Sequence, residues 1–408
     1  MTSELPSADG SNRSALPLPT LEAVASFENL YEAWRKASRG KKKRPDVARF
    51  SMHWENSLAA LSLAIRSGGY KPGRYRVFTV HEKKTRTIMA APFIDRVVHH
   101  AVCNVVTPHL EQSMVANSCA NRDGMGTHKG LALFGKYAHH YQYVLKCDIK
   151  QYFQSIDRVI LFDLLKPKIR DSGLLELIGR ILFVAPDIAG EFDYFEGDNL
   201  LAPCERVRGL PIGNMTSQTW ANWYLNGLDH FIMDYCGFGA YVRYVDDFAA
   251  FSNDKHALAG LKLKIEQYAA RLRLRIHPLK SRVYKTRDGV SFLGFRHYRG
   301  YRVLLKPNIR RFRRRIRRAV AEGADASRLR ASIAGWAGFA LHGDTFCLRT
   351  RLCRKFEKQK EGLSEMVPRS AWGLVEQQQR QLPFREPQQQ QPGQQEQQLR
   401  VPLRVATA

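Results

Sequence analysis

Two groups of aspartates stand where the sequence changes from one local pattern to another. Asp246 and Asp247 are adjacent within YVRYVDDFAAF, residues 241–251, where two β-rich runs predict a hairpin with both carboxylates at its tip. Asp148 ends the β-rich run 143–147 and precedes a helical pattern, so its carboxylate should point out of the edge of a sheet. Two strands that bring carboxylates to one edge can bind two metal ions about 3.5–4 Å apart, which serves in-line phosphoryl or nucleotidyl transfer.

Each half of this pattern also has a simpler interpretation. A pair of aspartates in a turn is typical of a solvated surface turn, and Asp148 fits the N-cap of the following helix. The two halves together are more specific than either one. Adjacent carboxylates repel each other unless cations lie between them, and Mg²⁺ prefers carboxylate oxygens together with substrate phosphates. The sequence therefore predicts a divalent metal site at Asp148, Asp246 and Asp247.

The charge of the chain indicates a polyanionic partner. Its 408 residues include 64 Lys and Arg against 38 Asp and Glu, a formal net charge of +26. Such a field attracts nucleic acid, although a basic surface with no such partner is the simpler alternative. No apolar run reaches the roughly 18 residues of a membrane helix, and the polar N-terminus argues against secretion. The seven cysteines never form C-x-x-C, which argues against zinc ribbons and disulfides and favours the cytoplasm.

Composition changes along the chain predict five segments. A polar, disordered tail (1–20) is followed by a helical extension (21–48) and one continuous body of mixed helices and strands (49–305). A very basic helical segment (306–358) comes next, and a Gln/Pro-rich tail (359–408) that cannot bury a core ends the chain.

The basic helical segment contains an unusual density of arginines around an apolar pair. Phe312 and Ile316 are four residues apart and should share one face of a helix. A solvated helix face is one interpretation, but the charge density favours contacts with a nucleic-acid backbone, which would be independent of base sequence and sensitive to salt. The residues that we expect to make these contacts are Arg310, Arg311, Arg313, Arg314 and Arg317.

Together with further blocks in the same order, the two aspartate motifs resemble those of the reverse transcriptase palm. The blocks are PFIDRVV (92–98), GLPIG (209–213) followed by Ser217, LKS (279–281) and FLGF (292–295). The resemblance covers about residues 50–355. It implies an α+β right-hand polymerase with fingers and palm, built as an antiparallel sheet with helices, and a helical thumb. It also implies an RNA-directed DNA polymerase that uses dNTPs, two Mg²⁺ ions (Mn²⁺ as a possible substitute) and an RNA/DNA primer–template duplex.

A finer resemblance is to the reverse transcriptases of diversity-generating retroelements. Ile212 stands where the usual motif has Gln, and Ser217 is followed by Gln218. The blocks APFIDRVVHH (91–100) and GTHK (126–129) are similar to that subfamily. The resemblance implies a template-repeat RNA copied with errors at adenines, and a small basic accessory protein. Since a branched apolar side chain cannot make the amide hydrogen bonds of Gln, Ile212 should hold the template base and nucleotide less strictly; a neutral packing change is the alternative.

The resemblance also implies roles for single residues. Asp148 and Asp246 would bind metal with Asp247 close by, and Lys280 would protonate the departing pyrophosphate as general acid, unless it is a plain surface lysine. The aromatic Phe153 would exclude a ribose 2′-hydroxyl, although a core aromatic fits equally well. The residues expected to bind the nucleotide are Arg86, Lys84, Phe153, Ile212, Gly213 and Gln218.

Two other functions remain open from the sequence. One is a group II intron-like or retron-type reverse transcriptase of ordinary fidelity. The other is a non-polymerising RNA-binding protein, for instance in phage defence, which the presence of all three expected carboxylates disfavours.

Overall fold

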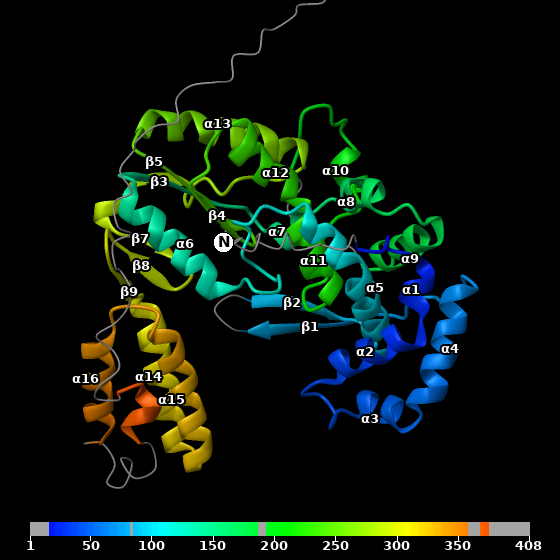
Figure 1. The fold of residues 1–408 in the computed structure, drawn as a ribbon, viewed down its shortest axis with the longest axis horizontal. Helices are drawn as coiled ribbons and strands as arrows, with labels where there is room; N and C mark the ends of the chain where they lie inside the picture. The colour runs from blue at the N-terminus through cyan, green and yellow to red at the C-terminus, as the bar shows by residue number, and fades with distance from the viewer. Residues whose placement is uncertain (1–15, 82–84, 187–192, 358–367, 375–408) are drawn as a thin grey trace, which may run out of the picture. The chain divides into compact units, whose positions relative to one another are not determined.

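The computed structural model describes residues 16–81, 85–186, 193–357 and 368–374. Lys84, most of the predicted N-terminal tail and most of the Gln/Pro-rich tail lie outside these ranges. The chain forms two compact units, one made of residues up to 315 together with 342–345, the other of 316–341 and the residues from 346 onward. Helices and sheets are mixed, as the predicted α+β class requires (Figure 1).

The first unit holds most of the helices and all described strands. Its α-helices are α1 (Leu21–Ala25), α2 (Phe27–Ser38), α3 (Pro45–Met52), α4 (Trp54–Arg66), α5 (Phe93–Gln112), α6 (Thr127–His140), α7 (Tyr152–Ser155), α8 (Arg158–Leu165), α9 (Ser172–Phe183), α10 (Ala202–Glu205), α11 (Met215–Tyr224), α12 (Asn226–His230) and α13 (Lys255–Arg271). Its strands are β1 (Arg76–His81), β2 (Thr85–Ala90), β3 (Tyr143–Asp148), β4 (Tyr241–Tyr244), β5 (Asp247–Ser252), β6 (Arg282–Lys285), β7 (Val290–Phe292), β8 (Phe295–His297) and β9 (Arg302–Leu304).

A four-stranded antiparallel sheet of order β4-β5-β3-β6 lies at the centre of this unit. Successive residues of a strand face opposite sides of a sheet, and the cores follow this rule. Leu145 of β3 packs in the larger core with Leu261 of α13, whereas its neighbour Val144 packs with Phe134 of α6. Helices α13 and α6 thus cover opposite faces of the sheet (Figure 1).

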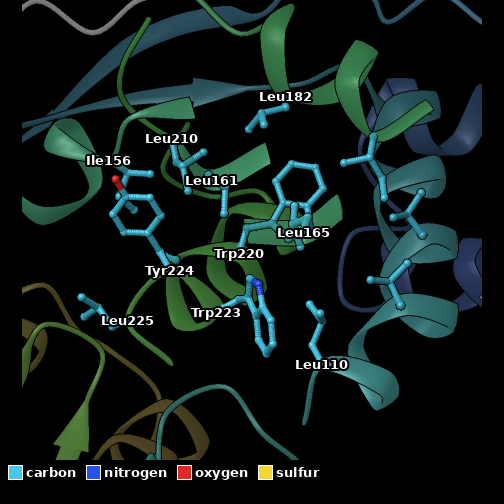
Figure 2. Close-up of a cluster of buried hydrophobic side chains, with 14 of the residues drawn as sticks. Leu110, Ile156, Leu161, Leu165, Leu182, Leu210, Trp220, Trp223, Tyr224 and Leu225 are labelled. Atoms are coloured by element: carbon cyan, nitrogen blue, oxygen red, sulfur yellow. The ribbon is translucent and has the colours of Figure 1, made fainter. Parts of the chain in front are cut away.

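The larger core continues away from the sheet into a cluster of helices. Figure 2 shows Trp220, Trp223 and Tyr224 of α11 among leucines of α5, α8 and α9. The indole of Trp223 donates to the backbone carbonyl of Leu164, and the hydroxyl of Tyr224 donates to that of Leu272. Helix α11 is therefore anchored by packing and hydrogen bonds in the same core as α13.

The N-terminal helical stretch differs from the sequence prediction in two ways. It breaks at Ser26, whose hydroxyl accepts a hydrogen bond from the backbone N–H of Asn29 and begins α2. Its apolar side chains, among them Val24 and Leu30, also belong to the same core as the sheet. The predicted extension is thus part of the first unit.

The second unit is helical and contains the end of α14 (Lys306–Ala321), α15 (Ala326–Ala340) and α16 (Phe346–Glu357). A short 3₁₀ helix, η4 (Arg369–Trp372), lies within the segment predicted as a disordered tail. The ring of Trp372 is only 2% exposed and stacks on Phe356 at 5.7 Å. A buried tryptophan is a large apolar contribution, which is why order extends beyond the predicted boundary at residue 359.

No helix in the described part of the chain is both long enough and apolar enough to span a membrane. The seven cysteines all lie among the described residues, and they are free thiols there.

Candidate active site

The predicted hairpin is confirmed, and its strands place two of the aspartates. Strand β4 pairs with β5 so that Tyr244 is opposite Asp247, which leaves Val245 and Asp246 as the turn. Strand β5 also pairs with β3, and this register sets Asp148 directly opposite Asp247. Three carboxylates from segments about 100 residues apart therefore meet at one edge of the sheet.

The turn itself is strained. Val245 has φ +60°, a left-handed conformation that is a genuine outlier for a β-branched residue. Such strain costs of order 1–3 kcal/mol and persists only where the surroundings hold it, often at functional sites. The conformation lets a two-residue turn place Asp246 between the two strands.

The N-cap interpretation of Asp148 is wrong, because the cap position of α7 is Gln151. Instead, the backbone carbonyl of Asp148 accepts a hydrogen bond from the backbone N–H of His277 at 2.7 Å, and its N–H donates to the hydroxyl of Ser281 at 3.2 Å. The turn between these two residues brings the ammonium group of Lys280 to 2.5 Å from an oxygen of the Asp148 carboxylate. The structure thus places Lys280 directly against Asp148.

Asp247 is partly buried and only partly neutralised. Its Oδ2 lies 3.3 Å from the ammonium group of Lys146, while its Oδ1 is buried with no hydrogen-bond partner among the described residues. Burial raises the pKa of Asp247 to about 7, and the nearby charges of Asp148 and Asp246 add to this while Lys146 opposes it. A buried carboxylate oxygen without a donor is costly and marks a place where a cation would bind favourably.

Among the described residues, no group of three or more His, Cys, Asp or Glu side chains is already arranged to hold a metal ion. The carboxylates of Asp148 and Asp247 are instead in contact with lysines. Mg²⁺ is commonly held by only one or two carboxylates together with substrate phosphates. The donor set therefore fits a metal that is completed by a nucleotide rather than one held by protein alone.

A buried network around Arg243 supports the hairpin, and sequence reasoning missed it. Its guanidinium forms a bidentate ion pair with the carboxylate of Asp229, at 2.7 and 2.5 Å, with both side chains fully buried. It also donates to the side chain of Asn222 at 2.7 Å and to the backbone carbonyl of Val245 at 3.1 Å. The hydroxyl of Tyr241 donates to the same Asp229 carboxylate. The side chain of Arg243 thus ties the strained turn to α11 and α12. No local pattern in the sequence indicates that this arginine is buried.

The glycine-rich loop 209–213 lies beside Phe153. The backbone N–H of Leu210 donates to the carbonyl of Phe153 at 2.7 Å, and that of Gly209 to Ile156 at 2.8 Å. The ring of Phe153 is half-buried against the core and lies edge-on to Tyr152. Its position agrees with both interpretations given above, since one part of the ring packs and another stays accessible.

A second buried arginine, Arg158, anchors the start of this loop. Its guanidinium donates to the backbone carbonyls of Gly209, Ala185, Pro186 and Arg208. Arg158 is completely buried, and nothing in its sequence neighbourhood indicates that it should be.

The other predicted nucleotide-binding residues are placed less completely. Ile212 is half-buried and lies with Gly213 in a turn, where Gly213 has φ +113° and faces Ile88 of β2. Gln218 is half-buried on α11. Arg86 lies on β2 as predicted, but its side chain and the whole of Lys84 lie outside the described residues.

The segment GTHK also lies beside the hairpin that carries Asp246 and Asp247. The hydroxyl of Thr127, at the start of α6, lies 3.1 Å from that of Tyr244. A Cβ at Gly130 would come within 3.8 Å of the Tyr244 ring and 3.0 Å of Leu293. The hairpin, the FLGF block and the start of α6 thus meet, which their sequence positions do not reveal.

The arginine-rich segment forms a helix as predicted, α14. Phe312 and Ile316 are buried, so the arginines cover the remaining faces. Of the predicted contact residues, Arg313 is half-buried. The others are exposed: Arg310, Arg311, Arg314 and Arg317.

Comparison with known proteins identifies the family of the chain. Residues 71–297 match the family described as reverse transcriptase (RNA-dependent DNA polymerase). The match covers more than half of the chain, and the protein belongs to this family.

Among curated proteins, the chain is 26% identical over 219 residues to the group II intron-encoded protein LtrA of Lactococcus lactis subsp. cremoris, and equally to that of its strain MG1363. The aligned part is 53% of this chain and 34% of LtrA. The chain therefore spans about a third of the length of the curated relatives that it matches.

We predict that Arg243→Met lowers the free energy of unfolding by about 3–5 kcal/mol, because it leaves the buried Asp229 carboxylate without its partner. Arg243→Met combined with Asp229→Leu should recover much of this loss, since neither buried charge remains. Chemical denaturation measures both. The exposed pair Lys166–Asp163 is the control, and Lys166→Met should cost less than about 1 kcal/mol. A similarly small loss for Arg243→Met would show that the network does not stabilise the fold.

We also predict a pH-dependent contribution from Asp247 in the metal-free protein. Its pKa is raised from 3.8 to about 7, so the folded state binds the proton more tightly than the unfolded state does. The stabilisation that protonated Asp247 gives to the folded state is therefore complete below about pH 4, and it is lost as the pH rises through 7. The free energy of unfolding of the wild type should therefore fall, relative to Asp247→Asn, between pH 4 and pH 7. Parallel profiles of the two proteins would contradict this.

Proposed function

We propose that this protein is an RNA-directed DNA polymerase that extends a primer 3′-hydroxyl on an RNA template with dNTPs. The observation that carries the proposal is the register that sets Asp148 opposite Asp247, with Asp246 in the adjoining turn, in a chain of the reverse transcriptase family. Carboxylates from two strands at one sheet edge are the arrangement suited to nucleotidyl transfer.

The site fits two divalent cations, Mg²⁺ in the first place and Mn²⁺ as a substitute, held by Asp148 and Asp246 with Asp247 beside them. The unsatisfied Oδ1 of Asp247 supports this fit. When bound, the ions would lower the pKa of the primer hydroxyl and neutralise the leaving pyrophosphate. Lys280 forms an ion pair with Asp148, and we assign its ammonium group to protonation of the leaving oxygen.

The loop and the aromatic side chain form the nucleotide side of the proposed site. Phe153 and the loop 209–213 are joined by backbone hydrogen bonds, so a change in one moves the other. We assign Phe153 to the exclusion of a ribose 2′-hydroxyl. Ile212, Gly213 and Gln218 are assigned to the templating base and nucleotide, and Arg86 with Lys84 to the triphosphate, for which a guanidinium is suited to bidentate contacts.

The right-hand division follows from the same proposal. Residues 49–305 would form fingers and palm, and residues 306–358 the thumb, with the exposed arginines of α14 along the template–primer backbone. The net charge of +26 supports an extended nucleic-acid partner.

Within the family we propose the subtype of the diversity-generating retroelements, with a template-repeat RNA, errors at adenines, and a small basic accessory protein. Ile212 in the loop and the GTHK segment beside Tyr244 favour it. The similarity to the group II intron-encoded protein LtrA favours the second candidate, an intron-like enzyme of ordinary fidelity.

We expect Asp246→Ala to reduce dNTP incorporation at least about a hundredfold, because charge stabilisation in the transition state is lost. A primer-extension assay on an RNA template, with accessory protein and cognate RNA supplied, measures this. Asp163→Ala, which removes an exposed carboxylate of α8, should leave incorporation unchanged. Equal incorporation by Asp246→Ala and wild type would reject the proposed site, and no incorporation by either would favour a non-polymerising RNA-binding protein.

We expect Ile212→Gln to lower misincorporation opposite adenine by a factor of roughly 3–10, the value of one restored hydrogen bond. Sequencing of cDNA from an adenine-rich template measures the rate, and Ile212→Leu, which stays apolar, is the matched control. Faithful copying of adenines by the wild type would instead support the intron-like alternative.

A further inference from the structure

A small basic cavity lies at the end of the central sheet away from the carboxylates. Its volume is about 320 Å³, and it is lined by Gln142, Tyr143, Lys285, Thr286, Arg287 and Arg299. Tyr143 begins β3 and is paired with Lys285, whereas Asp148 ends the same strand. At about 3.4 Å per residue, the two ends of β3 lie roughly 17 Å apart. The cavity is therefore separate from the proposed active site.

Buried backbone contacts fix the frame of this cavity. Thr286 is buried, and its hydroxyl and backbone N–H donate to the carbonyls of Tyr141 and Gln142, respectively, at 2.7 and 2.9 Å. Arg299, from the connection between β8 and β9, donates through Nε to the carbonyl of His139 at the end of α6, at 3.3 Å. The walls thus come from three separate segments that are locked together, while the charged ends of the side chains stay exposed.

The charge of the lining is one-sided. It contains three cations and no acidic side chain. Among the described residues, neither Lys285 nor Arg299 has an ion-pair partner, and Arg287 has only the exposed Asp288 at 3.7 Å. Uncompensated cations around a cavity favour an anion.

We propose that this cavity binds one nucleotide of a single-stranded polynucleotide, with its phosphate against Lys285 and Arg299. Cavities of about 300 Å³ suit small ligands. A guanidinium and an ammonium are both suited to phosphate, and Tyr143, half-buried against the larger core, lines the cavity beside them. The site would hold the strand outside the primer–template duplex. Its occupant, a nucleic acid, follows from the proposed function, but its binding needs no catalysis.

The test compares two double variants that remove the same amount of charge. Lys285→Ala with Arg299→Ala removes the cations of the cavity, and Lys264→Ala with Arg271→Ala removes two cations of α13. Fluorescence anisotropy with a labelled 20-nucleotide RNA, the DNA of the same sequence, and competing inorganic phosphate gives the affinities. The cavity variant should bind RNA about tenfold more weakly, and the slope of log K against log salt should shrink by about 0.7 for each phosphate that the variant no longer neutralises.

The comparison of RNA, DNA and inorganic phosphate shows which kind of phosphate the cavity binds. A loss confined to RNA assigns the site to the RNA strand, and an equal loss for DNA assigns it to the backbone common to both; either result supports the site. Equal weakening by both double variants would reject it, because the effect would then be one of net charge. The proposal would also be rejected if the cavity variant bound the oligonucleotides as tightly as the wild type does, and only its response to inorganic phosphate had changed.

Two further measurements separate this proposal from the polymerase proposal. An RNA with 4-thiouridine should crosslink to the peptide that contains Tyr143, and crosslinks found only in other peptides would overturn the proposal. Single-nucleotide extension of a short primer–template by the cavity variant should stay within about twofold of wild type, given the distance from Asp148. If the cavity variant lost extension while its RNA affinity stayed unchanged, the proposal of a separate site would be overturned. If Asp246→Ala did not affect extension, only the polymerase proposal would be overturned.

Discussion

The ion pair between Arg243 and Asp229 is the interaction on which the site depends most. Two fully buried charges are costly unless every donor and acceptor is satisfied, and here the guanidinium also reaches Asn222 and the carbonyl of Val245. A left-handed valine beside two aspartates would otherwise relax. The same side chain fixes β4, α11 and α12 to one another, so the carboxylate turn and the helix after the glycine-rich loop cannot move independently.

Electrostatic repulsion shapes the edge that this network supports. The aspartates are tolerated there because lysines from β3 and from the turn before β6 lie on two of them. An ammonium group can neutralise one carboxylate but cannot bridge several oxygens as a divalent ion can. The edge therefore fits the proposed role, in which a cation would arrive with phosphate oxygens of a nucleotide, and Lys280 lies against Asp148 at this edge.

Three of the places where basic groups gather in the described chain are the carboxylate edge, the cavity at the other end of β3, and the exposed faces of α14. Only those at the edge are paired with the aspartates of the hairpin and β3. Most of the others remain available for phosphates, which is consistent with a chain whose large positive charge is not neutralised internally. Binding of a long polyanion would compensate several of these groups at once.

Local patterns in the sequence were sufficient to determine the hairpin at Asp246 and Asp247, the strand that ends at Asp148 and the helix that carries the arginines. Alternation, turn residues and helical spacing are properties of short segments, so each could be identified without knowledge of the rest. They also determined the family, through motifs in a fixed order. They did not indicate the break at Ser26 or the packed segment around Trp372, since a single cap and a single buried ring leave little periodicity.

Only the tertiary structure decided which of these groups meet. The register of β3 against β5 sets Asp148 opposite Asp247, and the turn before β6 brings Lys280 onto Asp148 from more than 100 residues away. The burial of Arg243 and Arg158 was equally hidden, because a lone arginine in a sequence is almost always exposed. Its burial becomes favourable only when acceptors from several distant segments converge on it, and that convergence is a property of the folded chain.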